Sequence, residues 1–322
     1  MNITKQGHED RFNEIIPKIN IHWDLILMCN YNCSYCYARN LDYFGQKWLK
    51  IPNMEQQKSV VDAISKSHLP FNLGLLGGEP TLYPRFHQLL DYIFEKCSRN
   101  EAYSTENQIY LVTNGSKSRE WFEKLPQNSN FSVLFSYHPE FCKNSEILES
   151  IKSTLNRGIK SKVNIMLHPS QKIWPKIEEF YKECSKIKNL KMHPHFLYKQ
   201  SDKYLWDYSE DFWVWAKNNF GEFERDIAFE ELIGDETRHH LFNDFEVYSK
   251  GINRFNGFNC MNNNYEINID GSVTIFCKNE RYDLIKNQDY FSNITKINPM
   301  KCEYDMCNCD GLLKIFKYKE KI

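Results

Sequence analysis

The sequence predicts an α/β fold in which six parallel strands alternate with helices, followed by a small cysteine-rich domain. Two observations carry this prediction. Short apolar runs of strand length alternate with longer segments whose apolar residues recur at helical spacing, and this alternation is typical of a parallel sheet with right-handed crossovers. In addition, five of the eleven cysteines fall within residues 260–322, around one strong hairpin signal.

The bulk properties exclude several classes of protein. The chain has 322 residues, enough for one large core and a smaller appended domain. The net charge is −1, so no overall field favours nucleic acid or an anionic membrane. The sequence lacks both an apolar run of membrane-spanning length and a signal peptide at its start. We therefore expect a cytoplasmic protein, whose cysteines serve as metal or redox ligands rather than disulfides.

The sequence predicts six strands and five helices. Strands are expected at residues 19–27, 71–76, 108–112, 131–135, 162–167 and 190–197, and helices at residues 54–67, 86–97, 120–125, 147–155 and 173–187. Gly158 suits the position just after the fourth helix, where a left-handed residue commonly ends a helix. The domains are expected to be an N-terminal extension (1–18), the α/β domain (19–198), a mostly helical, aromatic-rich linker (199–254) and the cysteine-rich domain (255–322).

Three cysteines follow the first strand at C-x3-C-x2-C spacing: Cys29, Cys33 and Cys36. Clustered thiolates hold iron–sulfur clusters or zinc. A closed structural site needs four protein ligands, whereas three leave one coordination position open for an outside ligand. The spacing therefore favours a metal centre with an open position.

The second strand ends in Gly77-Gly78-Glu79-Pro80. Two glycines let the backbone approach a neighbour closely, and the glutamate offers a carboxylate at the carboxyl end of a strand. An ordinary turn is the alternative, because the same residue types are common breakers.

With Tyr35 as the aromatic residue before the last cysteine, and with this Gly-Gly-Glu-Pro turn, residues 19–198 resemble the radical S-adenosylmethionine (radical SAM) enzymes. The resemblance implies a partial (βα)6 TIM-like barrel and a 4Fe–4S cluster held by the three cysteines, with SAM on the fourth iron. Reductive cleavage of SAM would give a 5′-deoxyadenosyl radical that abstracts a hydrogen atom from the substrate. The resemblance further implies that Gly77, Gly78, Glu79 and Pro80 contact the SAM amino group, and that Asn114 and Ser136 contact its ribose and carboxylate. Capped turns remain the alternative for the last two.

Further polar residues lie near the carboxyl ends of the expected strands, where barrel enzymes concentrate catalytic groups. For any of the histidines, the alternative is a hydrogen-bonded loop residue. The candidate catalytic residues are Tyr137, His138, His168 and His195, and Glu140 and His193 lie nearby in the sequence.

The C-terminal cysteines surround a hairpin signal, Asp270-Gly271, between alternating apolar residues. The hairpin should bring Cys260 and Cys277 together. This region resembles the auxiliary-cluster extension of radical SAM enzymes called SPASM, or its shorter form, twitch. Its five cysteines are one more than the four ligands of one auxiliary 4Fe–4S cluster, and a four-cysteine zinc site is the alternative. The expected ligands are Cys260, Cys277, Cys302, Cys307 and Cys309.

Three functions remain open. SPASM and twitch enzymes often modify ribosomally made peptides, and we favour this maturase function. The alternatives are a dehydrogenase acting on a small metabolite, such as a sugar or aminocyclitol, and a non-catalytic zinc-binding module. Cys29 lies too near the start of the sequence for a preceding peptide-binding domain, so a maturase would use a separate leader-peptide-binding protein or read its substrate at the barrel mouth. A reductant such as flavodoxin or ferredoxin is expected to supply the electron.

Overall fold

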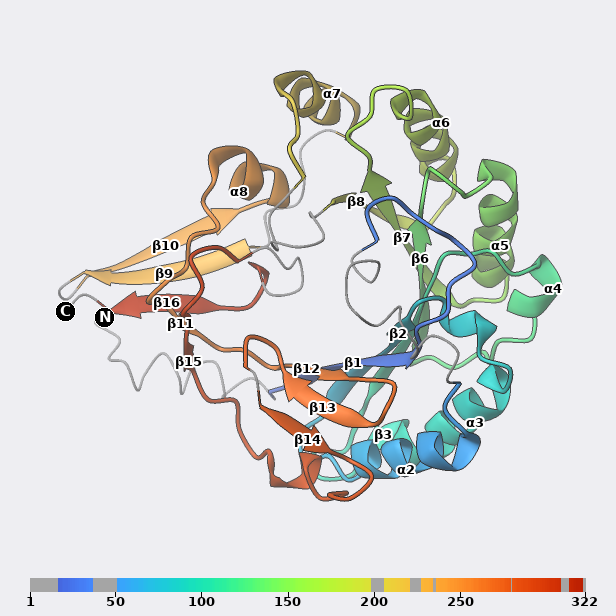
Figure 1. Ribbon diagram of the computed structural model, residues 1–322, viewed down its shortest axis with the longest axis vertical. Helices are drawn as coiled ribbons and strands as arrows, with labels where there is room; N and C mark the ends of the chain where they lie inside the picture. The colour runs from blue at the N-terminus through green and yellow to red at the C-terminus, as the bar shows by residue number, and fades with distance from the viewer. Residues whose placement is uncertain are drawn as a thin grey trace.

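The computed structural model of the chain describes residues 17–36, 51–197, 206–220, 227–233, 236–278, 280–307 and 313–320 (Figure 1). Cys309 and most of the expected N-terminal extension lie outside these residues. Among the described residues, no helix combines the length and the apolar character that crossing a bilayer requires.

Six parallel strands form the main part of a nine-stranded sheet, in the order in which they occur along the chain. Every pairing between neighbours among the six is parallel. This confirms the predicted alternation. The strands are β1 (Ile19–Ile26), β2 (Phe71–Gly77), β5 (Gln108–Thr113), β6 (Phe131–Tyr137), β7 (Lys160–Leu167) and β8 (Lys191–Phe196), and the helices between them are α2 (Met54–Ser65), α3 (Phe86–Cys97), α4 (Arg119–Phe122), α5 (Asn144–Asn156) and α6 (Trp174–Ser185).

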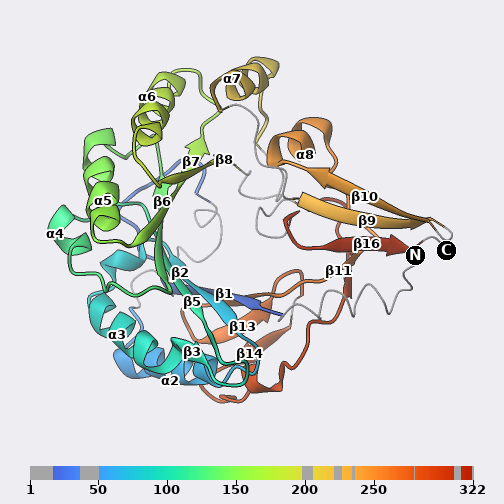
Figure 2. The same ribbon diagram turned by 180° about the vertical axis from the view of Figure 1, so that it is seen from behind.

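The sheet curves as a partial barrel, with the helices along its outer face (Figures 1 and 2). The sequence of β1 explains the two faces. Ile19, Ile21 and Trp23 are buried, whereas the alternate residues, His22 and Asp24 among them, are partly exposed on the other face. The concave face of the barrel is therefore polar while the convex face carries the core.

A C-terminal hairpin extends this sheet. The hairpin predicted around Asp270-Gly271 is present: β12 (Asn264–Ile267) pairs antiparallel with β13 (Ser272–Ile275), and β14 (Arg281–Asp283) follows. β12 also pairs in parallel with β1. The hairpin thus continues the barrel sheet across the expected boundary at residue 255, because β1 otherwise has an open edge.

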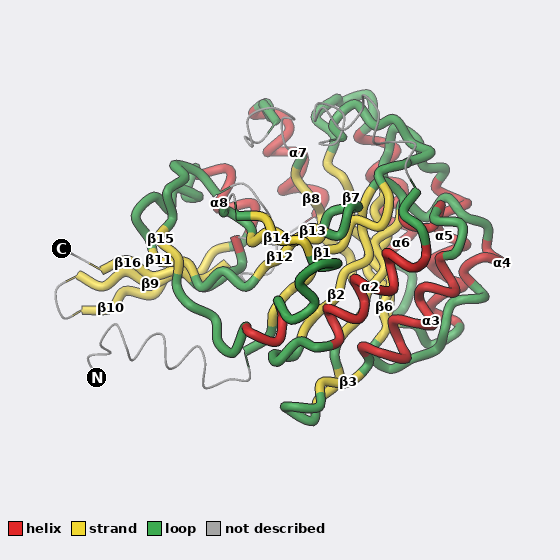
Figure 3. The backbone as a smooth tube through the Cα atoms, turned by 60° about the horizontal axis from the view of Figure 1, so that its bottom comes forward, coloured by secondary structure: helices red, strands yellow, loops and turns green. Residues whose placement is uncertain are grey.

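A second sheet of five strands, in the order β10-β9-β16-β11-β15, lies beside the barrel (Figure 3). Two of its strands belong to residues 199–254, which were predicted to be mostly helical. That prediction is wrong for β9 and β10, which pair antiparallel with each other, and β9 pairs in addition in parallel with the distant strand β16. The strands are β9 (Ile227–Ile233), β10 (Glu236–Phe242), β11 (Asn259–Cys260), β15 (Met300–Lys301) and β16 (Lys317–Glu320).

The two helices of residues 199–254 pack with aromatic side chains. Trp215 stacks on Trp174 of α6, with ring centroids 4.6 Å apart. Phe212 stacks on Tyr208 at 3.8 Å. The remaining elements are α7 (Glu210–Phe220), α8 (Asp244–Lys250), the short strands β3 (Arg99–Asn100) and β4 (Thr105–Glu106), and the 3-10 turns η4 (Pro80–Leu82) and η5 (Phe291–Asn293).

Candidate active site

The cysteine loop leaves the carboxyl end of β1. Cys33 is buried, and Cys29 and Cys36 are partly exposed. The Tyr31 N–H donates a hydrogen bond to Cys29 Sγ at 3.3 Å, and the side-chain amide of Asn114 approaches the same sulfur at 3.8 Å. These donors are suited to a thiolate.

The three thiols interact with one another. The pKa of Cys29 is raised to about 11 and that of Cys33 to about 12, mainly by burial and in smaller part by neighbouring carboxylates and thiols. A bound cation is what would hold such groups as thiolates. In the part of the chain that the structure describes, no three His, Cys, Asp or Glu side chains are gathered closely enough to hold a metal ion. The donor set, three thiols on one loop with N–H groups directed at sulfur, fits a cluster with one open position.

The Gly-Gly pair docks the end of β2 against this loop. The N–H of Gly78 donates to Ile26 O at 2.8 Å, and the N–H of Glu79 donates to Met28 O at 2.7 Å. A Cβ at Gly78 would lie 2.2 Å from Met28 O, and Gly77 has φ +126°. Only glycine allows this approach, so the pair has a structural use between two stretches of backbone. Its expected contact with SAM stays a prediction.

Glu79 is fully buried and accepts four hydrogen bonds. Oε1 accepts from the N–H and hydroxyl of Thr81 and from the hydroxyl of Thr113, and Oε2 accepts from the Asn114 N–H at 2.7 Å. Burial raises the pKa of the carboxyl, and the donors oppose that rise. Since Oε2 has one such donor, it is the atom with acceptor capacity left for the expected SAM ammonium.

Asn114 carries this network to the cysteine loop. Its side-chain amide donates to Asn30 Oδ1 at 3.0 Å, and its Oδ1 accepts from the Ser116 N–H at 3.0 Å. Asn114 is buried at the end of β5, and its expected contact with SAM would come in addition to these hydrogen bonds.

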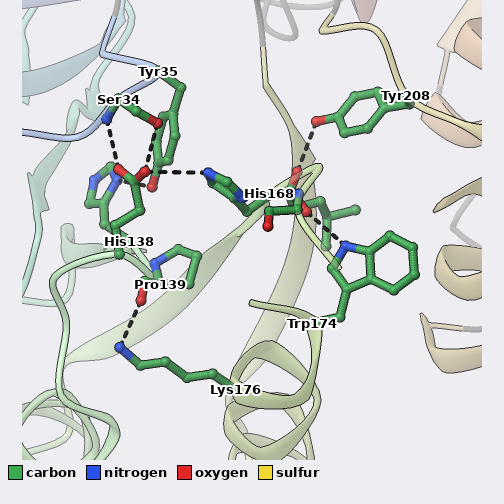
Figure 4. A network of polar contacts seen from close by, with 11 residues as sticks. Ser34, Tyr35, His138, Pro139, His168, Trp174, Lys176 and Tyr208 are labelled. Atoms are coloured by element: carbon green, nitrogen blue, oxygen red, sulfur yellow. Dashed lines mark hydrogen bonds and ion pairs between the residues drawn. The ribbon is translucent and has the colours of Figure 1, made fainter. Parts of the chain in front are cut away.

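A second carboxylate holds the other side of the loop (Figure 4). Glu140 accepts from the N–H and the hydroxyl of Ser34, at 2.7 and 2.6 Å. Its Oε1 also lies 3.3 Å from His168 Nε2. The Ser170 N–H donates to His168 Nδ1 at 3.1 Å, which leaves the ring proton on Nε2, facing Glu140. The loop after β6 is itself fixed, because Lys176 Nζ donates to Pro139 O at 2.7 Å.

Tyr35, the aromatic residue of the motif, fills the space between the two candidate histidines. Its hydroxyl lies 3.0 Å from His138 Nδ1, and its ring stacks on His138 and meets His168 edge-on, each at 5.8 Å between centroids. Burial lowers the pKa of His138 to about 4, so this ring is neutral at pH 7. Both candidate histidines, His138 and His168, therefore contact Tyr35 of the cysteine loop.

The other candidates lie apart. Tyr137 has no exposed surface: its ring stacks on Phe180 and its hydroxyl donates to Asn144, on the helical side of the sheet, which argues against a catalytic role. Ser136 is buried at the end of β6. His195 is partly exposed on β8, with its ring 6.3 Å from that of His193.

Sequence reasoning missed three residues that build the site: Ser34, Thr81 and Thr113. Thr81 directly follows Pro80, and Thr113 directly precedes Asn114. These positions next to expected site residues could have identified both threonines from the sequence. The pairing of Ser34 with Glu140 spans 106 residues and leaves no local trace.

A model of the radical SAM superfamily matches residues 25–182, which include the cysteine loop, the Gly-Gly-Glu-Pro turn and the strand ends described above. The chain belongs to the radical SAM superfamily. It is therefore an enzyme, and the superfamily implies a 4Fe–4S cluster and SAM.

Solved structures share the fold of this radical SAM enzyme. Native anSMEcpe with bound AdoMet is 18% identical with a TM-score of 0.54, covering 87% of this chain and 83% of that one. The same protein with AdoMet and the Kp18Cys peptide gives a TM-score of 0.52 at the same identity and coverage. A curated relative, the S-adenosylmethionine-dependent nucleotide dehydratase of Selenomonas ruminantium, is 30% identical over 99 residues. That match spans only 31% of this chain and 30% of the relative.

Two C-terminal cysteines of this radical SAM enzyme, Cys277 and Cys302, lie close enough to Cys260 to influence its pKa. β11, which ends at Cys260, pairs with β15, and the N–H of Cys302 donates to Phe258 O at 2.7 Å. The pKa of Cys260 is raised to about 11, mainly by burial; Lys317 opposes this rise, and Cys277 and Cys302 add smaller contributions to it. Cys307 lies on the next stretch, where its N–H donates to Asn253 O at 2.8 Å. Cys309 lies outside the described residues.

Cys277 has φ +66°, in the left-handed region. For a residue other than glycine this conformation is unfavourable by about 1–2 kcal/mol. The preceding residue, Phe276, packs edge-on against His22 of β1 at 5.5 Å, so the cysteine lies directly beyond a side chain that touches the barrel.

Asp24 is a partly exposed acid on the concave face of β1, next to Glu266 of β12. Burial, and then Glu266, raise the pKa of Asp24 from 3.8 to about 7. The register pairs His22 with Glu266, so the two acids are diagonal neighbours on one face. The pair holds a proton through much of the range in which exposed carboxyls are ionised.

We expect Gly78→Ala to lower both the iron content and the rate of SAM cleavage, by about tenfold or more for the rate, because the new Cβ would displace the loop backbone at Met28. Gly158→Ala is the control: Gly158 has positive φ, but nothing lies within 4 Å of its Cβ position. That change should cost about 1 kcal/mol of stability and leave iron unchanged. Equal iron and equal rates in the two variants would contradict the role given to Gly78.

Asp24→Asn should make the protein more stable above pH 7 and leave it nearly unchanged near pH 4. Because the folded state keeps the Asp24 proton where the unfolded chain has lost it, wild-type stability falls as the pH rises from about 4 to about 7. The full pKa shift corresponds to about 4 kcal/mol in the free energy of unfolding. Because the side chain is partly exposed, we expect Asp24→Asn to raise this free energy above pH 7 by about 2 kcal/mol. Denaturant unfolding at pH 5 and pH 8 measures it. Asp91→Asn, at an exposed helix position, is the control, and a stability gain that does not grow with pH would contradict the assignment.

Proposed function

We propose that this radical SAM enzyme modifies a ribosomally made peptide. It would use a SAM-binding 4Fe–4S cluster on Cys29, Cys33 and Cys36 and one auxiliary 4Fe–4S cluster on the C-terminal cysteines. The observation that carries the first part is the pair of carboxylates, Glu79 and Glu140, that fix the cysteine loop from its two sides.

When bound, the cluster and SAM supply a carbon radical able to take a hydrogen atom from an unactivated C–H bond. The chain's own residues do the positioning. Asn114 and Ser34 hold the loop by hydrogen bonds, and Tyr35 packs it against buried Met166 and Leu197. Burial at these contacts keeps water from one side of the loop, which protects reactive species from side reactions.

The auxiliary site is proposed on Cys260, Cys277 and Cys302, with Cys307 or Cys309 completing it. Its support is the influence of Cys277 and Cys302 on the pKa of Cys260, together with the left-handed conformation kept at Cys277. Unfavourable backbone conformations persist where a side chain is needed in one place. A zinc site would use the same thiols, and only the metal itself separates the two.

A peptide substrate is supported by the shared fold with anSMEcpe, whose structure holds the Kp18Cys peptide. With 18% identity, the likeness supports the fold and leaves the substrate to experiment. The partners proposed with this function are a one-electron donor such as flavodoxin or ferredoxin, and a separate leader-peptide-binding protein.

A small molecule is the second candidate substrate. The relative from Selenomonas ruminantium acts on a nucleotide by its name, and it matches at higher identity, although over a shorter segment. A sugar or aminocyclitol dehydrogenase belongs to this alternative.

Anaerobically reconstituted and reduced protein should form 5′-deoxyadenosine from SAM, and the Cys29/Cys33/Cys36→Ala variant should form none, because the SAM cluster loses all its thiolates. Cys184→Ala removes a buried cysteine of α6 and serves as the control that keeps activity. Chromatography of the products measures it. Cleavage surviving in the triple variant would refute the cluster assignment.

The same assay chooses between substrates. Peptides encoded beside the gene and a set of nucleotides and sugars are added separately. A peptide that raises 5′-deoxyadenosine and changes mass supports the maturase. Turnover that responds to nucleotides or sugars and never to peptides would replace it with the second candidate.

The triple variant also isolates the second site. We expect it to bind about four irons and no stoichiometric zinc. In that background, Cys277→Ala and Cys277→Gly should both lose iron. Without metal, the Gly variant should be about 1 kcal/mol more stable to unfolding than the Ala variant, because glycine adopts the positive φ of this position without strain. Elemental analysis and denaturant unfolding measure the two effects. Full iron in both variants would remove Cys277 from the ligand set.

A further inference from the structure

A groove of about 770 Å³ lies on the helical side of the barrel, between the loop that follows β5 and one face of α5. α4, which follows the same loop, and α5 are neighbours there (Figures 1 and 2). Every side chain that lines the groove is polar or charged. A volume of this size is typical of a site for one small molecule. The groove is separate from the active site, although Ser116 at its edge donates its N–H to Asn114.

The loop is packed directly against α5. Gly115 has φ +70°, and a Cβ at this position would lie 2.8 Å from Cγ1 of Ile147 in α5. Glycine therefore allows the loop backbone to lie on the helix. The hydroxyl of Ser150 in α5 also donates to Lys117 O at 3.4 Å. These contacts hold the side chains of the loop and those of α5 along the two sides of one groove.

Two serine hydroxyls of this lining have no hydrogen-bond partner among the described residues. Ser153 of α5 is only 6% exposed, and its Oγ is buried and unpaired, as is that of Ser116. An unpaired buried hydroxyl is unfavourable. Because serine hydroxyls turn about χ1, a ligand with acceptor oxygens in the groove would give both of them a partner.

The cations of the groove indicate the charge of such a ligand. Lys117 comes from the loop and Lys152 from α5, and neither forms an ion pair within the part of the chain that the structure describes. Arg119, in the same lining, is instead paired with Glu123, with 2.7 Å between Nε and Oε1. Two ammonium groups without an ion-pair partner, beside two hydroxyl donors, suit a phosphate group.

Three carboxylates also line the groove: Glu120, Glu146 and Glu149. Glu146 is paired with Lys143, at 2.7 Å. The other two repel a bare phosphate, but a carboxylate accepts hydrogen bonds from sugar hydroxyls, as the acidic residue of dinucleotide-binding folds does from ribose. The mixture of signs therefore favours a ligand that carries both a phosphate and hydroxyl groups.

We propose that this groove binds a phosphorylated sugar, either free or as part of a nucleotide. Lys117 and Lys152 bind the phosphate, together with the hydroxyls of Ser116 and Ser153. Glu149 accepts hydrogen bonds from the sugar. This site is additional to the one that holds SAM.

The test uses full-length, anaerobically reconstituted protein saturated with SAM, so that the SAM site itself is filled. Ribose 5-phosphate, AMP and inorganic phosphate are titrated separately by calorimetry. Lys117→Gln/Lys152→Gln removes both charges, and Lys117→Arg/Lys152→Arg keeps them. Lys124→Gln is the matched control, because Lys124 is an exposed lysine just after α4 that does not line the groove.

We expect both sugar phosphates to bind more tightly than inorganic phosphate. The Gln pair should weaken the binding of all three compounds by about tenfold or more, because it removes charge-assisted hydrogen bonds, whereas the Arg pair and Lys124→Gln should stay near the parent. Tighter binding of AMP than of ribose 5-phosphate would identify a nucleotide as the ligand, and equal binding would identify a free sugar phosphate.

Two further variants test the hydroxyl and the carboxylate. Ser153→Ala should weaken phosphate binding and yet raise the melting temperature without ligand, because it removes an unpaired buried hydroxyl. Glu149→Gln should reduce the preference for ribose 5-phosphate over inorganic phosphate, because it removes the charge that favours the sugar and repels the phosphate.

Absence of saturable binding of all three compounds at millimolar concentration would overturn the proposal. Equal affinities in the Gln pair and in Lys124→Gln would also overturn it, because the phosphate would then bind elsewhere, and equal losses in the Gln and Arg pairs would leave the lysines only a packing role. Equal affinities for inorganic phosphate and ribose 5-phosphate, unchanged in Glu149→Gln, would refute recognition of the sugar. None of these results depends on the substrate that the enzyme modifies.

Discussion

The geometry of the active site depends on one buried carboxylate. Glu79 sits at the point where β2 ends, and its four donors come from its own turn and from the end of β5. A buried carboxylate without such donors would be strongly unfavourable, so the charge obliges these backbone segments to stay together. Through Asn114 the same bonds reach Asn30 in the cysteine loop. The loop that carries three thiols therefore takes its position from the sheet, although its own sequence has little to hold it.

The opposite side of the loop repeats this principle with Glu140. This residue links Ser34 to His168, and it lies just after a turn held by Lys176. The two histidines singled out for catalysis thus pack against Tyr35 and support the loop from beneath. Other polar groups of the sheet are partly exposed, among them His22 and Asp24 of β1 and His195 of β8.

Local sequence patterns predicted the six strands, the helices between them and the hairpin at Asp270-Gly271, because each depends on periodicity or turn chemistry within a few residues. They also identified the cysteine loop and the Gly-Gly-Glu-Pro turn. They did not reveal that β12 pairs with β1 or that β9 pairs with β16, since neither strand carries a mark of its distant partner. The side chain of Tyr137 illustrates a finer limit: a position at a strand end does not fix the face, and here the ring points into the helical layer.

The parallel pairing of β1 with β12 has a consequence for synthesis of the chain. β1 leaves the ribosome long before the strand that covers its edge, because that strand begins only at Asn264. Until then the backbone groups of that edge remain open to pairing with other chains, which is the usual hazard of an uncovered strand. The contact is also among the most distant in sequence, and such contacts form slowly. The sheet that bears the cysteine loop is completed late, so metal insertion and chaperone protection would need to be coordinated with the emergence of the C-terminal hairpin.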